Sequence, residues 1–149
     1  MQHAFTREVL NQIEAAIRSN EALHAGELRM AIEAALDFED VLSRITARER
    51  AVEVFKRLQV WDTEHNNGVL IYILYADRAI EIVADRGYNH RVSADEWRTV
   101  CAAGELAFRS AQFADGAVAL IDQVGRLIAR HFPARIGDLN ELPDRPTLL

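Results

Sequence analysis

The pattern of apolar residues predicts two strands joined by a short loop near the middle of the chain. Residues 68–75 form the unbroken apolar run GVLIYILY, which is typical of a central strand covered on both faces. Residues 79–84 carry isoleucines at alternate positions around a glutamate, as expected for a shorter strand, and residues 76–78 fit a hairpin loop. Because a hairpin returns to its starting point, we expect Asn67 and Asp85 to lie close together.

A further strand and a helix precede this hairpin. Residues 27–34 alternate Leu, Met and Ile with more polar residues, which favours a strand. Residues 46–49, TARE, match a capping box at the start of a helix that ends before Trp61. Strand, helix and strand in this order form a βαβ unit, whose two strands are parallel. Residues 35–45 fit either a loop or a short extra helical turn.

Three more helices are predicted around these strands. The first is capped by Thr6, and another begins at a second capping box, residues 93–96. We expect that helix to break within residues 104–110. The last helix keeps an apolar stripe from Phe113 onward and stops at Pro133. Helices before, between and after the strands can cover both faces of a small mixed β-sheet, so the predicted fold is α/β, a three-layer α/β/α sandwich.

The end of the chain differs in character from the rest. We divide the sequence into a folded domain, residues 1–133, and a proline-containing C-terminal tail, residues 134–149, which is extended or disordered. The tail is polar but carries four leucines, more apolar residues than disordered tails usually hold. These are Leu139, Leu142, Leu148 and Leu149. We therefore expect the tail to dock in extended form, onto its own domain or onto a neighbouring chain; the alternative is an unattached end.

Composition narrows the classes of partner and cofactor. A net charge of −6 and a pI near 5.3 argue against nucleic acid and against an anionic membrane surface. Cys101 is the single cysteine and lies in an apolar helical pattern, so it is predicted to be a core residue. The five histidines lack zinc spacing, so we expect no transition metal or organic cofactor. The chain shows neither a signal-peptide pattern nor a membrane span, which predicts a cytoplasmic location.

The predicted topology gathers polar groups at one edge of the sheet, where the parallel strands begin and the antiparallel strand ends. Carboxylate, carboxamide and carbonyl oxygens on loops suit a hard cation such as Ca²⁺ or Mg²⁺. The predicted ligands are Asp85, Asn67, Glu27 and Asp62, with Arg86 and His65 as further candidates and Gly87 and Gly68 shaping the turns. The alternative is that Asn67 and Asp85 only close turns.

The opposite edge of the sheet offers a rival site, because parallel-strand sheets commonly bind ligands where their strands end. An acidic loop follows the first strand there, and the hairpin turn lies beside it. The residues are Asp37, Glu39 and Asp40, with Asp77 and Arg78 in the turn. Acidic loops of this kind are more often solvated surface.

Several segments together resemble the TPM domain family, which is named for thylakoid-lumen, photosystem-repair and nematode receptor-modulating proteins. The matching segments are residues 26–29, 47–61, 66–71 and 83–87, followed by Trp97, Phe108, Phe113 and Gly116. The likeness runs from about Thr6 to Pro133, and the NGVL-to-DRG hairpin is its most specific part. The resemblance implies an α/β/α sandwich.

The resemblance also implies two functions. Plant members are described as acid phosphatases and calcium binding is reported in relatives, so Asn67, Asp85 and Gly87 inherit a site role, with Glu27 a weaker match. The sequence shows neither a signal-peptide pattern nor a membrane-helix pattern, and residues 85–90 differ from the Gly-Tyr-Gly-Leu-Glu-like segment of many members. Short members are often encoded near membrane-anchored TPM and LemA-type proteins. The main interpretation is therefore a binding or assembly module for such membrane-associated partners, and the alternative is a weak metal-dependent acid phosphatase.

Overall fold

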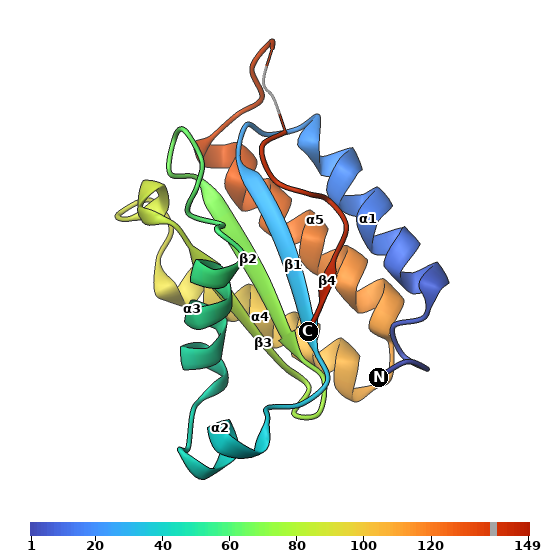
Figure 1. Ribbon diagram of the computed structural model, residues 1–149. Helices are drawn as coiled ribbons and strands as arrows, with labels where there is room; N and C mark the ends of the chain where they lie inside the picture. Colours follow the sequence, from blue (N-terminus) through green and yellow to red (C-terminus); the bar gives the residue numbers. More distant parts are fainter. Residues whose placement is uncertain (138–139) are drawn as a thin grey trace.

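The computed structural model describes residues 1–137 and 140–149 and contains one mixed four-stranded sheet (Figure 1). The strand order is β3-β2-β1-β4. The strands are β1 (Glu27–Glu33), β2 (Gly68–Leu74), β3 (Ala79–Ala84) and β4 (Thr147–Leu148). Strand β1 is parallel to β2 and to β4, whereas β2 and β3 form the predicted antiparallel hairpin.

Helices cover both faces of this sheet, which confirms the predicted α/β/α sandwich (Figure 1). Three long helices pack on one face: α1 (Arg7–Glu21), α4 (Ala94–Arg109) and α5 (Phe113–His131). Helix α3 (Ala47–Arg57) covers the other face. The short helix α2 (Phe38–Leu42) and the 3-10 helix η1 (Arg86–Tyr88) lie in connecting segments. Among the described residues, no helix is long and apolar enough to cross a membrane.

Strand β2 is central and buried on both faces, as its apolar run predicts. Val69, Ile71 and Ile73 belong to the larger core beneath α1, α4 and α5. Leu70 and Tyr72 belong to the smaller core beneath α3, and all five side chains are fully buried. Each buried side chain of this size contributes about 1.5–3 kcal/mol to folding, so the two cores together fix the strand between the helix layers.

One predicted segment is wrong, and an alternative left open at another segment is resolved. The predicted break within residues 104–110 is wrong, because α4 continues to Arg109 and the chain turns at Ser110, Ala111 (φ of 60°) and Gln112. Gly104 instead permits close packing, since a Cβ there would lie 2.7 Å from the Cδ1 atom of Ile80. Within residues 35–45 the chain forms the short helix α2, with Asp37 as its cap.

The tail lies extended along the outer edge of β1, on its own domain. Ala31 and Ile32 pair with Thr147 and Leu148, and the Leu149 amide donates to the Ile32 carbonyl at 2.9 Å. Leu142 is buried in the smaller core. Of the four leucines in the tail, Leu139 lies outside the described residues. The tail thereby closes the β1 edge of the sheet.

Candidate functional site

Three predicted site residues do meet at the edge where β1 and β2 begin. The Glu27 amide donates to the Asn67 carbonyl at 3.3 Å, and the Asp85 amide donates to the Gly68 carbonyl at 2.9 Å. Glu27 is in register with Gly68. The backbone therefore aligns Glu27, Gly68 and Asp85 in one row across three neighbouring strands, as the topology predicts.

The two turn-shaping glycines are required by close backbone approaches. A Cβ on Gly68 would lie 2.0 Å from the Val60 carbonyl oxygen, and one on Gly87 would lie 2.4 Å from the Asn66 carbonyl oxygen. The Gly87 amide donates to that same Asn66 carbonyl at 2.8 Å. Neither contact tolerates a side chain, so both glycines let the loops close over the ends of the strands.

Asn67 is only 1% exposed and holds several segments together. Its Nδ2 donates to the Ala25 carbonyl at 3.1 Å, and its own carbonyl accepts from the Tyr88 hydroxyl at 2.8 Å. Its Oδ1 is buried without a hydrogen-bond partner among the described residues. Because side chains alternate along a strand, Asn67 belongs to the face opposite that of Gly68 and Asp85.

Asp85 has one satisfied and one unsatisfied carboxylate oxygen. Its Oδ1 accepts from the Arg86 amide at 2.8 Å and caps η1. Its Oδ2 is buried and has no hydrogen-bond partner within the described part of the chain. A buried unpaired carboxylate oxygen is costly, so this atom is the strongest sign of a ligand at the edge.

Glu27 is buried beneath the tail. It is 5% exposed, and its Oε1 accepts from the Glu141 amide at 3.0 Å. Burial raises the pKa of Glu27 to about 7, although hydrogen bonds from the tail amides of Glu141 and Leu142 oppose this shift. Burial and a hydrogen bond with Asp144 likewise raise the pKa of the neighbouring Glu21 to about 8. Glu27 is thus tied to the tail.

The remaining candidates stand apart from this row. Asp62, His65 and Arg86 are exposed. The His65 Nε2 lies 4.0 Å from the Glu64 carboxylate, and the Arg86 amide bonds to Asp85. At the rival edge, Asp37 serves as the α2 cap and the Arg78 guanidinium lies 4.0 Å from the centre of the Tyr75 ring.

The row supplies individual ligands for a hard cation, but not a full set. Calcium takes about six to eight oxygens, several of them from carboxylates. In residues 1–137 and 140–149, no three His, Cys, Asp or Glu side chains lie together in a way that would hold a metal ion. Asp85 is the one predicted ligand with a free buried oxygen on its side of the sheet, so the edge fits a cation only in part.

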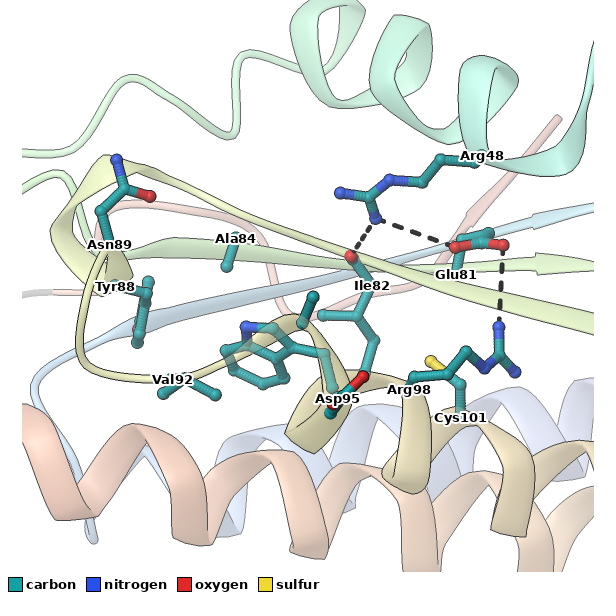
Figure 2. A pocket seen from close by; sticks show the side chains of 12 residues that line it. Arg48, Glu81, Ile82, Ala84, Tyr88, Asn89, Val92, Asp95, Arg98 and Cys101 are labelled. Atoms are coloured by element: carbon teal, nitrogen blue, oxygen red, sulfur yellow. Dashed lines mark hydrogen bonds and ion pairs between the residues drawn. The ribbon is translucent and has the colours of Figure 1, made fainter.

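A cleft of about 450 Å³ lies elsewhere, along the outer edge of β3 between α3 and α4 (Figure 2). Its apolar lining includes Tyr88, Val92 and Trp97, and its polar lining includes Arg48 and Arg98. Sequence reasoning missed this cleft. The signal for it was present only as a short strand at the edge of the sheet, flanked by two capped helices that carry arginines.

The backbone of β3 faces this cleft at alternate residues. Because Asp85 bonds to Gly68, the amides and carbonyls of Ile80, Ile82 and Ala84 point away from β2. Side chains bind the outward groups of Ile80: its amide donates to Glu105 at 3.0 Å, and its carbonyl accepts from Arg98 at 3.4 Å.

The Ile82 carbonyl accepts from Arg48, as Figure 2 shows. Glu81 lies between the two arginines, with its oxygens 3.8 Å from Arg48 and 3.7 Å from Arg98. Charged side chains therefore take the place of a next strand over Ile80 and Ile82, while Ala84 borders the cleft.

Cys101 reaches the inner end of the cleft but is 2% exposed. Burial raises the pKa of its thiol to about 12, so the thiol stays protonated near neutral pH. This agrees with its predicted role as a core residue.

Comparison with known proteins identifies the family. The sequence model of the TPM domain family matches residues 1–127. Among solved structures, the chain is similar to the BA42 protein of the psychrophilic bacterium Bizionia argentinensis, whose structure was determined by NMR. The two are 34% identical with a TM-score of 0.84, over 97% of this chain and 94% of that chain. No curated protein matches the sequence.

Proposed function

Because the chain belongs to the TPM domain family, we propose that it acts as a binding module for other proteins through the cleft beside β3. The observation that carries this proposal is that the cleft opens onto the backbone of an edge strand. An extended segment of a partner would add to the sheet beside β3, which is a common mode of peptide recognition.

The outer edge of β3 suits strand addition. The Ile80 amide and carbonyl and the Ile82 carbonyl point outward and are held by Glu105, Arg98 and Arg48. The side chains of both arginines are about half exposed, at 54% and 47%, so they can swing toward solvent. A partner strand would replace side-chain bonds with backbone bonds to the same groups and extend the pairing to Ala84.

The rest of the cleft would supply selectivity. Tyr88, Val92 and Trp97 form an apolar wall beside the strand, suited to anchor one or two apolar side chains of the partner. The positive and negative charges of the lining are equal in number: Arg48 and Arg98 are cationic, and Glu81 and Asp95 are anionic. A balanced lining favours an uncharged, apolar segment over a phosphate group or nucleic acid.

The partners that we propose are membrane-associated proteins, either membrane-anchored TPM proteins or LemA-type proteins. This part of the proposal rests on the family to which the chain belongs. An assembly role of this kind requires a surface for a protein segment, and the cleft provides one.

The cleft is tested with peptides selected from a random displayed library and titrated into isotope-labelled protein. Amide shifts are expected at Ala84, Asn89 and Val92. Asn89 is exposed and lines the cleft, so Asn89→Trp should fill the opening and weaken binding by about tenfold or more, while Asn89→Ala should bind like the wild type. Peptides that shift other surfaces, or that bind both variants equally, would remove the cleft as the site.

A second candidate function is favoured by the unpaired Asp85 Oδ2: a calcium-type site at the strand edge. A cation there would be held by Asp85, whose Oδ2 is buried and unpaired among the described residues. Calorimetric titration with Ca²⁺ and with Mg²⁺ should give binding to the wild type and none to Asp85→Asn. Phosphatase assays of the wild type and Asp85→Ala, with each metal, test the enzymatic alternative; equal rates in the two proteins would reject it at this residue.

A further inference from the structure

Helix α2 presents an apolar face to solvent. Its three large apolar side chains are 75% exposed at Phe38, 60% at Val41 and 66% at Leu42, and none of the helix residues is buried. Their spacing of three and four residues places them on one side of the helix. In Figure 1, α2 projects at one end of the sandwich, away from the layers that cover the sheet.

This helix is formed by local bonds and not by packing of its apolar face. The Asp37 Oδ1 accepts from the Asp40 amide at 2.8 Å, and the Ser43 amide donates to the Glu39 carbonyl at 2.9 Å. Both ends of the helix are therefore satisfied locally. The apolar face is left over after folding, and a preformed helix loses little entropy when it binds.

No other exposed apolar side chains of the described residues gather in this way. Leu23, Trp61, Leu106, Ile136 and Leu148 are each on a different segment of the chain. Single exposed apolar residues are ordinary, whereas three on one face of a helix mark an interaction surface.

The charge around α2 selects among the occupants. Asp37 and Glu39 flank the apolar face, whereas Asp40 lies on the opposite side of the helix. Asp37 and Glu39 are both exposed, so negative charge borders the apolar face. This charge repels an anionic bilayer, and it repels the same face of a second copy.

We infer that α2 docks its apolar face into an apolar groove on a partner protein whose rim carries lysine and arginine. Phe38, Val41 and Leu42 are the anchors, in the way amphipathic helices use residues at such spacing. Asp37 and Glu39 would meet the basic rim. This surface is separate from the cleft beside β3, so the inference does not depend on that proposal.

Site-specific photocrosslinking in the native cells tests this inference. The full chain carries p-benzoylphenylalanine at Phe38 in one variant and, as matched exposed controls, at Trp61 or Leu106 in two others. The expected result is a protein adduct from Phe38 that the controls do not form. The adduct protein is identified, purified and titrated with the wild type, Leu42→Ser and Leu106→Ser.

The inference holds if Leu42→Ser weakens binding by about tenfold or more, Leu106→Ser has no effect, and added salt weakens binding further. Glu39→Lys should also weaken it, by loss of the contact with the basic rim. Adducts with lipid alone, adducts only with a second copy, equal yields at Phe38 and Leu106, or an affinity unchanged in Leu42→Ser would each overturn it. An adduct lost in Asn89→Trp would assign the partner to the β3 cleft and would also overturn it.

Discussion

Replacing Glu27 by glutamine should make the protein more stable at alkaline pH. The Glu27 carboxylate is 5% exposed and lies under the tail, where its Oε1 accepts from the Glu141 amide. Glutamine keeps a carbonyl oxygen for that hydrogen bond but cannot ionise. The substitution therefore removes a buried charge and leaves the contact with the tail in place.

The size of the effect follows from the pKa of Glu27, which burial raises from an ordinary value of 4.5 to about 7. Between these two values the folded protein binds more protons than the unfolded chain, so its free energy of unfolding falls as pH rises through this window. Each pH unit is worth about 1.4 kcal/mol, which gives at most about 3.5 kcal/mol. Movement of the tail and entry of water reduce this value, so we expect about 2 kcal/mol.

Urea unfolding of both proteins at pH 5 and pH 8 measures this difference. The two should be nearly equally stable at pH 5, whereas Glu27→Gln should gain about 2 kcal/mol at pH 8, or about 4–8 °C in Tm. Glu64→Gln is the matched control, because the Glu64 side chain is 79% exposed and should change stability little at either pH. The Glu27 carboxylate also helps to raise the pKa of the neighbouring Glu21, so removing its charge should ease the ionisation of Glu21 and add to the gain at pH 8.

Two results would refute the reasoning. If Glu27→Gln were no more stable than the wild type at pH 8, the Glu27 carboxylate would not be held in a buried site. If it were equally stabilised at pH 5 and pH 8, the gain would come from packing or hydrogen bonding and not from ionisation.

Three further predictions concern folding, each measured by urea or thermal unfolding. Deleting residues 140–149 should lower Tm by several degrees, because it uncovers the smaller core and removes β4; an unchanged Tm would contradict docking of the tail on its own domain. Gly68→Ala should cost about 2 kcal/mol or more, since the new Cβ would meet the Val60 carbonyl, and a neutral effect would contradict that contact. Arg50→Met should cost about 3 kcal/mol at pH 8, because it leaves Glu33 buried without the two guanidinium bonds of 2.8 and 2.9 Å, and the cost should shrink at pH 5.

The layers of this fold can be predicted from the sequence because a strand buried on both faces has a distinctive apolar pattern. A strand covered on both sides must be apolar at every position, and residues 68–75 are the only such run in the chain. The βαβ order then fixes the parallel pair, and alternation in β1 assigns Leu28 and Met30 to the larger core. The break expected within residues 104–110 failed because Gly104 serves packing against Ile80, a contact that no local pattern encodes.

For the candidate site, the sequence predicts which backbone positions lie together but not how their side chains are buried or paired. Hairpin geometry places Asp85 beside Gly68, but the burial of Glu27 depends on Glu141, 114 positions further along the chain. Likewise, the cleft depends on Arg48 and Arg98 arriving at β3 from two different helices. Such contacts are set by tertiary packing, and periodicity in the sequence carries no information about them.

The two edges of the sheet are closed by different means, and this difference supports assigning partner binding to β3. To open the β1 edge, the tail must withdraw Leu142 from the core, break the β4 pairing and uncover Glu27. To open the β3 edge, Glu105 and the two half-exposed arginines must release the strand backbone. Bonds to charged groups are worth about 1.5–3 kcal/mol each, and here they are exchanged for similar bonds to water or to a partner. An incoming strand returns backbone hydrogen bonds at once and gains the apolar wall of the cleft. The edge that costs less to open is therefore the one suited to reversible binding, and the tail serves to keep the other edge closed.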